Sequence, residues 1–176
     1  MPLVRYATGG YICTSPFPYD GIFRRAVLNF KFHNCGAYAE LLSHEMVRSI
    51  KDVYRDRKFD LVTCVPMHKD TLRKRGYNQA ELLAKECARI LGIEYADLLV
   101  KTKKNKTQHS IKAAERAKNV IGVYSPINKN LIKGKRILII DDIITTGSTL
   151  GECARILNKC KCGEICCCTL CTSLLI

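Results

Sequence analysis

Residues 136–157 have the sequence RILIIDDIITTGSTLGECARIL. Residues 136–140 are apolar and β-branched, which is typical of a buried strand, and Asp141 and Asp142 close this run. A loop rich in threonine, glycine and serine follows, and apolar residues then recur at helical spacing over residues 150–157. Because open α/β sheets bind ligands beyond the carboxyl ends of their strands, this pattern predicts a ligand site at the loop.

The loop over residues 145–149 predicts an anion site. Gly147 permits a tight turn, and backbone N–H groups and hydroxyls at the start of a helix can enclose a phosphate. Asp141 and Asp142 would repel that phosphate unless they bind something else, such as sugar hydroxyls or a divalent cation. A phosphorylated sugar meets both requirements. The alternative is structural: the two acids end a strand, and a hydroxyl of the loop caps the helix.

The rest of the chain alternates between helical and strand-like patterns. Apolar spacing predicts helices over residues 21–32, 37–54 and 79–91, and short apolar runs predict strands over residues 59–65, 97–100, 120–124 and 164–172. A basic loop is expected after Pro66. The alternation predicts an α/β fold with a mostly parallel twisted sheet and helices on both faces. With no repeat and no long linker, residues 1–176 are expected to form one domain.

Composition indicates a globular chain with an anionic partner. The 176 residues are 47% hydrophobic and 26% charged, which excludes a disordered tail, a coiled coil and a collagen-like repeat. No apolar run reaches the roughly 18 residues that span a membrane, and the first residues lack a secretory pattern, so we expect a cytoplasmic protein with reduced thiols. The net charge is +13, and residues 101–136 carry eleven basic residues against the single acid Glu115. A nucleic acid, a phosphorylated small molecule or an acidic protein surface would suit this charge.

Neither a Walker A lysine motif nor a G-x-G-x-x-G is present, which argues against P-loop and dinucleotide-binding sites. Residues 139–149 instead resemble the phosphoribosyl-pyrophosphate (PRPP) signature of type I phosphoribosyltransferases. Four further blocks resemble the ComF family, the competence-associated, phosphoribosyltransferase-like proteins that include the GntX type. The blocks are Tyr19-Asp20-Gly21 with Phe30-Lys31-Phe32, Val65-Pro66-Met67-His68, Arg73-Lys74-Arg75-Gly76-Tyr77-Asn78-Gln79, and Gln108 with Arg116, Asn119, Gly122 and Tyr124. The resemblance covers nearly the whole chain and implies the type I phosphoribosyltransferase fold.

The resemblance also implies a role for each part of the site. The ribose hydroxyls of PRPP would lie on Asp141 and Asp142, and its 5′-phosphate on Thr145, Thr146, Gly147, Ser148 and Thr149. The pyrophosphate would lie on Pro66, Met67, His68 and Lys69, with Arg73, Lys74 and Arg75 adding charge. A mobile loop would close over the substrate and contain Lys101, Lys103, Lys104, Gln108 and Arg116. Mg²⁺ would bridge the pyrophosphate, held mainly by PRPP and water.

The implied reaction transfers a phosphoribosyl group from PRPP to an acceptor and releases pyrophosphate. The acceptor stays open because a variable hood selects it in this fold, here residues 1–35 and parts of the middle. Two other classes of function remain: a non-catalytic PRPP sensor, and a DNA-uptake accessory that binds single-stranded DNA through Tyr77 and the basic residues 73–75. Oligomeric state is not predicted.

The chain departs from the family pattern in two ways. Members commonly begin with a Cys-x-x-Cys zinc module, whereas this chain has only Cys13 and Cys35 near its start, so no zinc is predicted. Positions 101 and 103 are lysines where the family tends to have arginine, and a lysine cannot make the bidentate phosphate contact of an arginine.

Six cysteines gather near the carboxyl terminus: Cys160, Cys162, Cys166, Cys167, Cys168 and Cys171. Because successive side chains of a strand face opposite sides, Cys167 and Cys168 would point apart, and we expect them to fill a buried edge of the sheet. A metal site of Cys160 and Cys162 with Cys168 or Cys171 is the alternative. The four histidines lack metal-ligand spacing, and only His68 and His109 lie in segments with an expected function.

Overall fold

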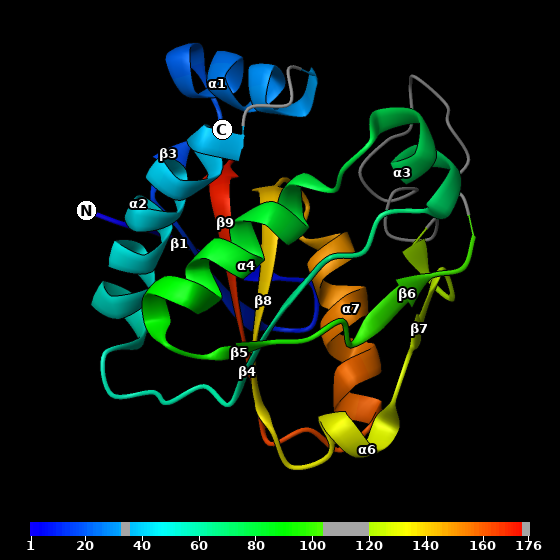
Figure 1. The fold of residues 1–176 in the computed structure, drawn as a ribbon. Coiled ribbons are helices and arrows are strands. Elements are labelled where there is room, and N and C mark those ends of the chain that lie inside the picture. Colours follow the sequence, from blue (N-terminus) through cyan, green and yellow to red (C-terminus); the bar gives the residue numbers. More distant parts are fainter. Residues whose placement is uncertain (33–35, 104–119, 174–176) are drawn as a thin grey trace.

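The computed structural model describes residues 1–32, 36–103 and 120–173. Within these ranges a seven-stranded sheet has the order β1-β2-β9-β8-β4-β5, with β3 paired to β9 (Figure 1). The strands are β1 (Leu3–Ala7), β2 (Tyr11–Ser15), β3 (Phe17–Pro18), β4 (Leu61–Cys64), β5 (Glu94–Tyr95), β8 (Arg136–Ile144) and β9 (Glu164–Thr172). In this sheet the β1–β2 pair is antiparallel, and the other described pairs are parallel. The prediction of a mostly parallel sheet is therefore confirmed.

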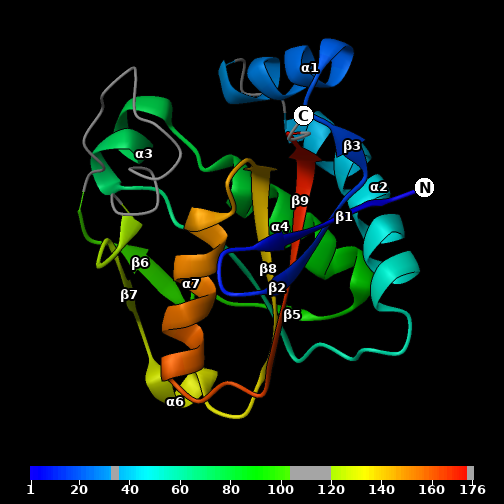
Figure 2. The same cartoon turned by 180° about the vertical axis from the view of Figure 1, so that it is seen from behind.

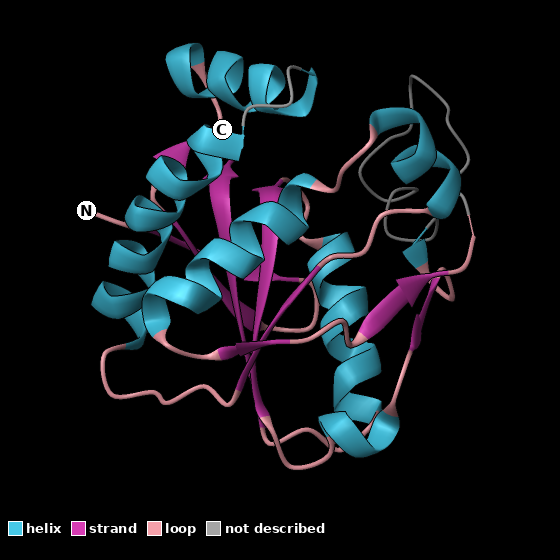
Figure 3. Ribbon diagram, viewed as in Figure 1, coloured by secondary structure: helices cyan, strands magenta, loops and turns pink. Residues whose placement is uncertain are grey.

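Helices cover both faces of this sheet (Figures 2 and 3). One face carries α2 (Gly36–Tyr54) and α4 (Gln79–Leu91), and the other carries α7 (Ser148–Lys159) with a two-stranded ribbon of β6 (Leu99–Lys101) and β7 (Tyr124–Pro126). Alternation along β8 supplies both cores, because Leu138 and Ile140 pack toward α2 and α4, whereas Ile137 and Ile139 pack toward α7. A strand buried on both faces explains the continuous apolar run at residues 137–140.

The cysteines of β9 divide between the same two cores. Cys166 and Cys168 pack on the α2 side and Cys167 on the α7 side, as predicted from strand alternation. The prediction that β9 lies at an edge of the sheet is wrong, because the hairpin of β1 and β2 extends the sheet beyond it. Among the described residues, no three His, Cys, Asp or Glu side chains are grouped so that they could hold a metal ion.

Two further sequence predictions need correction. The basic stretch after Pro66 is not a loop but contains a helix, α3 (Lys69–Arg75), because His68 caps its start and Gly76, at φ 87°, ends it. Asp141 and Asp142 do not close their strand, since β8 continues to Ile144. Pairing with β9, which runs alongside to Thr172, carries the hydrogen-bond ladder past both acids.

The remaining helices lie outside the two main layers. The short helix α6 (Lys129–Ile132) precedes β8, and α1 (Gly21–Phe32) lies across the end of the structure at which β8 and β9 finish (Figure 1). The Tyr77 hydroxyl donates to the Phe30 carbonyl at 2.6 Å and so ties α1 to the segment before α4. The hood over residues 1–35 stays a prediction, but β1, β2 and β3 belong to the sheet, and within the described residues 1–32 it is α1 that lies across the strand ends. No described helix combines the length and apolar character needed to cross a membrane.

Candidate functional site

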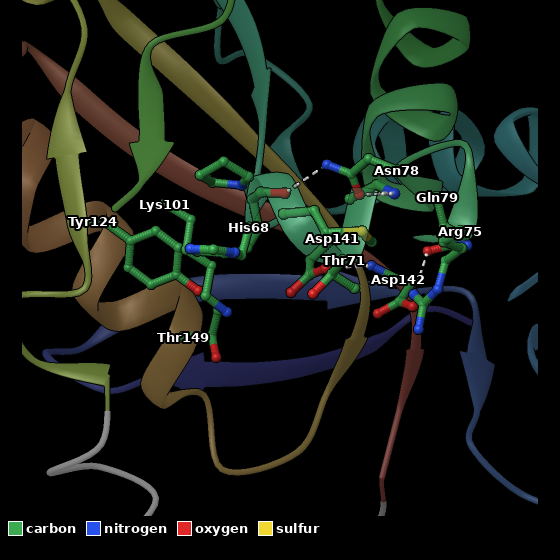
Figure 4. A pocket seen from close by; sticks show the side chains of 14 residues that line it. His68, Thr71, Arg75, Asn78, Gln79, Lys101, Tyr124, Asp141, Asp142 and Thr149 are labelled. Carbon is green, nitrogen blue, oxygen red and sulfur yellow. Dashed lines mark hydrogen bonds between the residues drawn. The ribbon is translucent and has the colours of Figure 1, made fainter. Parts of the chain in front are cut away.

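A cavity of about 260 Å³ lies at the carboxyl ends of β4 and β8 (Figure 4). These strands are parallel neighbours, and the chain leaves them toward opposite faces: through α3 to α4 after β4, and into α7 after β8. Such a divergence opens a crevice between strand ends, where α/β sheets bind ligands. The lining residues are Val65, Pro66, Met67, His68, Thr71, Arg75, Asn78, Gln79, Ala80, Lys101, Tyr124, Asp141, Asp142 and Thr149.

Asn78 holds the β4 side of the cavity in place. Its side-chain oxygen accepts the Ala80 N–H at 3.2 Å and caps α4, while its amide donates to the Val65 carbonyl at 3.1 Å. Asn78 is buried, so both bonds replace lost contacts with water. One side chain thereby joins the end of β4 to the start of α4.

His68 has a similar local role at α3. Its Nδ1 accepts the Asp70 N–H at 3.2 Å and lies 3.8 Å from an Asp70 carboxylate oxygen. His68 thus shapes the loop through one nitrogen and lines the cavity with the same ring.

The structure separates the residues predicted to hold pyrophosphate into two groups. Pro66, Met67, His68 and Arg75 line the cavity, and Arg75 donates to the Gln79 side chain at 3.0 Å. Lys69, Arg73 and Lys74 are exposed and are not among the lining residues. Position on α3 explains the difference, because only one side of a helix can face the cavity.

Asp141 and Asp142 line the cavity from β8 and are half-buried. One Asp141 carboxylate oxygen accepts the Asp142 N–H at 2.8 Å, which fixes the orientation of that carboxylate. In the view of Figure 4 the two acids lie between the His68, Lys101 and Tyr124 side chains and the Arg75 side chain. Carboxylates with cations on either side suit a ligand that carries both hydroxyls and anionic groups.

The loop at residues 145–149 contributes Thr149 to the cavity lining. Gly147 is the N-cap of α7 at φ 74°, and no side chain caps this helix. Thr146 and Ser148 share a hydroxyl hydrogen bond of 2.9 Å. Thr145, Thr146, Gly147 and Ser148 do not line this cavity. The uncapped helix start leaves backbone N–H groups for an anion.

Lys101 and Tyr124 enter the cavity from the ribbon of β6 and β7. The Lys101 ammonium lies 5.5 Å from the centre of the Tyr124 ring, and burial lowers the pKa of Lys101. Burial likewise raises the pKa of the Tyr124 hydroxyl. Lys101 was predicted in a mobile loop but lies on a strand, paired with Tyr124.

The other residues of the predicted mobile loop do not reach the cavity or lie beyond what is described. Lys103 is exposed and is absent from the lining. Lys104, Gln108 and Arg116, together with His109, fall outside the described residues.

Sequence reasoning missed five polar or small lining residues as site residues: Thr71, Asn78, Gln79, Ala80 and Tyr124. The signal was present for three of them, because Asn78, Gln79 and Tyr124 belong to the blocks that resemble the ComF family. Thr71 and Ala80 carry no such signal, since their place depends on how α3 and α4 pack.

The donor set of this cavity fits Mg²⁺ held jointly by protein and ligand. Asp141 and Asp142 supply carboxylate oxygens, which Mg²⁺ prefers, and two carboxylates are too few for an all-protein cage. The ion would therefore take its remaining ligands from a bound phosphate compound and from water.

Comparison with known proteins agrees with this geometry. A phosphoribosyl transferase domain matches residues 77–174. Competence protein F of Haemophilus influenzae is 33% identical over 144 residues, which are 79% of this chain and 63% of that protein. DNA utilization protein YhgH of Escherichia coli K12 is 30% identical over 101 residues, 57% of this chain and 44% of that protein. This chain thus spans less than two thirds of either relative.

A solved structure shows the same fold. Glutamine phosphoribosylpyrophosphate amidotransferase of Bacillus subtilis superposes with a TM-score of 0.54 over 80% of this chain and 30% of that chain, at 17% identity. The fold is the type I phosphoribosyltransferase fold. The chain therefore belongs to the phosphoribosyl transferase domain family, as a ComF-type member.

Proposed function

We propose that this chain binds PRPP with Mg²⁺ and transfers its phosphoribosyl group to an acceptor with release of pyrophosphate. The observation that carries the proposal is the cavity itself. Two carboxylates, an arginine, a lysine and the start of an uncapped helix converge where the parallel strands β4 and β8 end. Asp141 and Asp142 would accept hydrogen bonds from the ribose hydroxyls.

In this reaction the protein would form no covalent bond to the substrate. The acceptor attacks C1′, the bond from C1′ to the pyrophosphate oxygen breaks, and pyrophosphate leaves with the electron pair. Positive charge develops on the ribose and negative charge on the leaving group, so fixed positioning and cations matter more than a nucleophilic side chain. Arg75 and His68 would face the pyrophosphate, and Asp141 would stabilise the ribose. A bound Mg²⁺ would neutralise part of the pyrophosphate charge.

Ligand-induced stabilisation tests this proposal directly. PRPP with Mg²⁺, present at about one hundred times its Kd, should stabilise the protein by about 2.7 kcal/mol. Calorimetry with PRPP, ribose 5-phosphate and pyrophosphate, each with and without Mg²⁺, measures the affinities. We expect all three to bind and PRPP to bind most tightly, because it fills both subsites.

The controls are a nucleoside monophosphate and inorganic sulfate at matched ionic strength, which separate a shaped site from general attraction to a basic protein. Folded protein that shows neither heat nor a thermal shift with millimolar PRPP and Mg²⁺ would exclude the phosphoribosyl proposal.

Single-stranded DNA is the second candidate ligand, favoured by the name of the DNA utilization relative and by the net charge of +13. The Tyr77 hydroxyl donates to the Phe30 carbonyl, so only the ring of this half-buried side chain could contact a base. We expect weak, sequence-blind binding that falls steeply with salt and that PRPP partly displaces.

Fluorescence anisotropy with a labelled oligonucleotide across a salt series, with and without PRPP and Mg²⁺, decides between the candidates. Tight binding at physiological salt that ignores PRPP would make nucleic-acid binding the primary function.

A further inference from the structure

The loop at residues 145–149 has little internal support. Its helix, α7, begins at Gly147 without a side-chain cap, and within the loop the Thr146 hydroxyl bonds the Ser148 hydroxyl at 2.9 Å and accepts the Ser148 N–H at 3.4 Å. Gly147, at φ 74°, adds to this weakness, because glycine loses more conformational freedom on folding than any other residue type. A loop that must hold an anion in a fixed geometry needs support from elsewhere in the fold.

The turn between β1 and β2 supplies that support. Thr8 donates its N–H to the Gly147 carbonyl at 3.3 Å. A Cβ on Gly147 would lie 2.7 Å from the Ala7 Cα, and a Cβ on Gly151 would lie 2.3 Å from the Thr8 carbonyl oxygen. The two backbones therefore touch at two points where no side chain would fit. Gly147 and Gly151 are four residues apart and so lie on one side of the helix start.

The turn itself is firmly attached to the sheet. Gly10 donates to the Ala7 carbonyl at 3.0 Å, and Gly9 and Gly10 both take positive φ, at 93° and 82°. Its second strand, β2, pairs with β9, which pairs with the β8 that carries the acids. Figure 2 shows the turn beside the first half of α7. The turn is thus connected through β2 and β9 to β8, and its contact with the loop at residues 145–149 fixes the position of that loop relative to β8.

We propose that this contact, which we call the hairpin contact (the turn at residues 8–10 against Gly147 and Gly151), positions the loop for the sugar-phosphate end of the ligand. The proposal rests on the proposed PRPP function. Thr8 and Gly151 are positioning residues, because they act through the loop and do not line the cavity. The hairpin lies outside residues 77–174, the part that matches the phosphoribosyl transferase domain.

A pair of matched glycine variants tests the hairpin contact. Gly151→Ala puts a methyl group against the Thr8 carbonyl, and Gly163→Ala puts one 2.7 Å from the Gly134 carbonyl at the far end of β9. Neither glycine has positive φ, so both variants introduce the same kind of clash. Calorimetry then measures three affinities for each protein: PRPP with Mg²⁺, ribose 5-phosphate, and pyrophosphate with Mg²⁺.

We expect Gly151→Ala to lower the affinities for ribose 5-phosphate and PRPP by roughly tenfold and to leave the affinity for pyrophosphate unchanged. Displacement of one loop affects only the end of the ligand that this loop holds. Gly163→Ala should change none of the three affinities. If the two variants change the affinities equally, or if Gly151→Ala lowers the affinities for pyrophosphate and ribose 5-phosphate equally, the hairpin contact supports the fold and does not position the loop.

A second pair covers the case in which Gly151→Ala does not fold. Thr8→Pro removes the N–H that bonds Gly147 at an exposed turn, and Thr8→Ala keeps it. Only Thr8→Pro should weaken ribose 5-phosphate, and identical affinities in the two variants would overturn the proposal. Wild-type protein that binds none of the three ligands would exclude the proposed function itself, which separates that failure from a failure of the hairpin contact.

Discussion

The loop after β4 and the loop after β8 begin on neighbouring strands, yet they are held in opposite ways. The first is fixed by its own side chains, since His68 caps α3 and Asn78 ties β4 to α4. The second has no capping side chain and is contacted by a hairpin more than 130 residues away in the chain. The first loop contributes the charge of Arg75 to the cavity lining, and the second contributes Thr149, in the first turn of α7. A site for a ligand with two phosphate ends can therefore be built from one locally specified half and one half specified by tertiary contact.

Neutralising the two acids between these loops should have the largest effect. We expect Asp141→Asn with Asp142→Asn to weaken PRPP by roughly a hundredfold or more, because hydrogen bonds to charged groups contribute about 1.5–3 kcal/mol each. The fold should persist, since an asparagine at position 141 keeps a side-chain oxygen that can accept the backbone N–H of residue 142. Calorimetry and thermal unfolding measure the two quantities. Asp52→Asn with Asp56→Asn, both exposed, matches the change in charge; an unfolded site variant would show that the acids are structural.

Removing the side chain that holds the first loop should mainly lower stability. Asn78→Ala deletes the α4 cap and leaves the Val65 carbonyl without its amide donor, which should cost about 2–3 kcal/mol in the free energy of unfolding. Asn128→Ala deletes an exposed cap on α6 and should cost about 1 kcal/mol or less. Urea unfolding of both variants gives the comparison, and equal losses would contradict a special role for Asn78.

Two arginines of α3 allow a comparison between a residue that lines the cavity, Arg75, and an exposed residue, Arg73. Arg75→Ala should weaken pyrophosphate about tenfold, because a charge-assisted hydrogen bond is lost, and should leave ribose 5-phosphate unchanged. Arg73→Ala removes the same charge from an exposed position and should change neither affinity. If the two variants weaken pyrophosphate equally, the net charge of α3 matters and the position of Arg75 does not.

The smallest effect concerns the pH dependence of ligand affinity. Burial lowers the pKa of Lys101 from its ordinary value of 10.5, so its ammonium loses its proton at a lower pH than an exposed lysine does. PRPP favours the charged form, and its affinity should therefore fall by a few-fold as pH rises through this lowered pKa. Tyr124 and Cys153 face Lys101 but stay protonated, because burial raises the pKa of both. Lys101→Arg should abolish the decline, and an unchanged profile would place the titrating group elsewhere.

Sequence patterns predicted the helices and strands whose apolar residues recur at a regular spacing within one continuous segment. The bounds of α1, α4 and β9 agree with residues 21–32, 79–91 and 164–172, because each element alternates or repeats its apolar residues without interruption. The hairpin of β1 and β2 was missed, because its strands form by pairing with each other and with β9, far away in the chain. Apolar Val4 and Tyr6 on β1 are exposed, so this strand lacks the buried pattern of the others.

The site divides in the same way. Asp141, Asp142 and Thr149 follow from one contiguous motif, and Pro66 to His68 follow from the place where a strand ends. Lys101 reaches the cavity only because β6 pairs with β7, a contact between residues 23 positions apart that no local pattern records. Likewise, nothing local distinguishes Arg75 from Arg73, since the choice depends on the rotation of α3 against the sheet.

The buried cysteines of β9 allow transient opening of the protein interior to be measured by their rate of alkylation. Burial raises the pKa of Cys166 to about 11 and those of Cys167 and Cys168 well above the ordinary value of 9.0. Alkylating reagents attack thiolates that they can reach, so these groups react only when the helices that cover the two faces of β9 move away from it. Cys162, half-exposed just before the strand, reacts without that movement and supplies an internal reference. The ratio of the alkylation rate of the buried cysteines to that of Cys162 therefore measures how often the two cores beside β9 open.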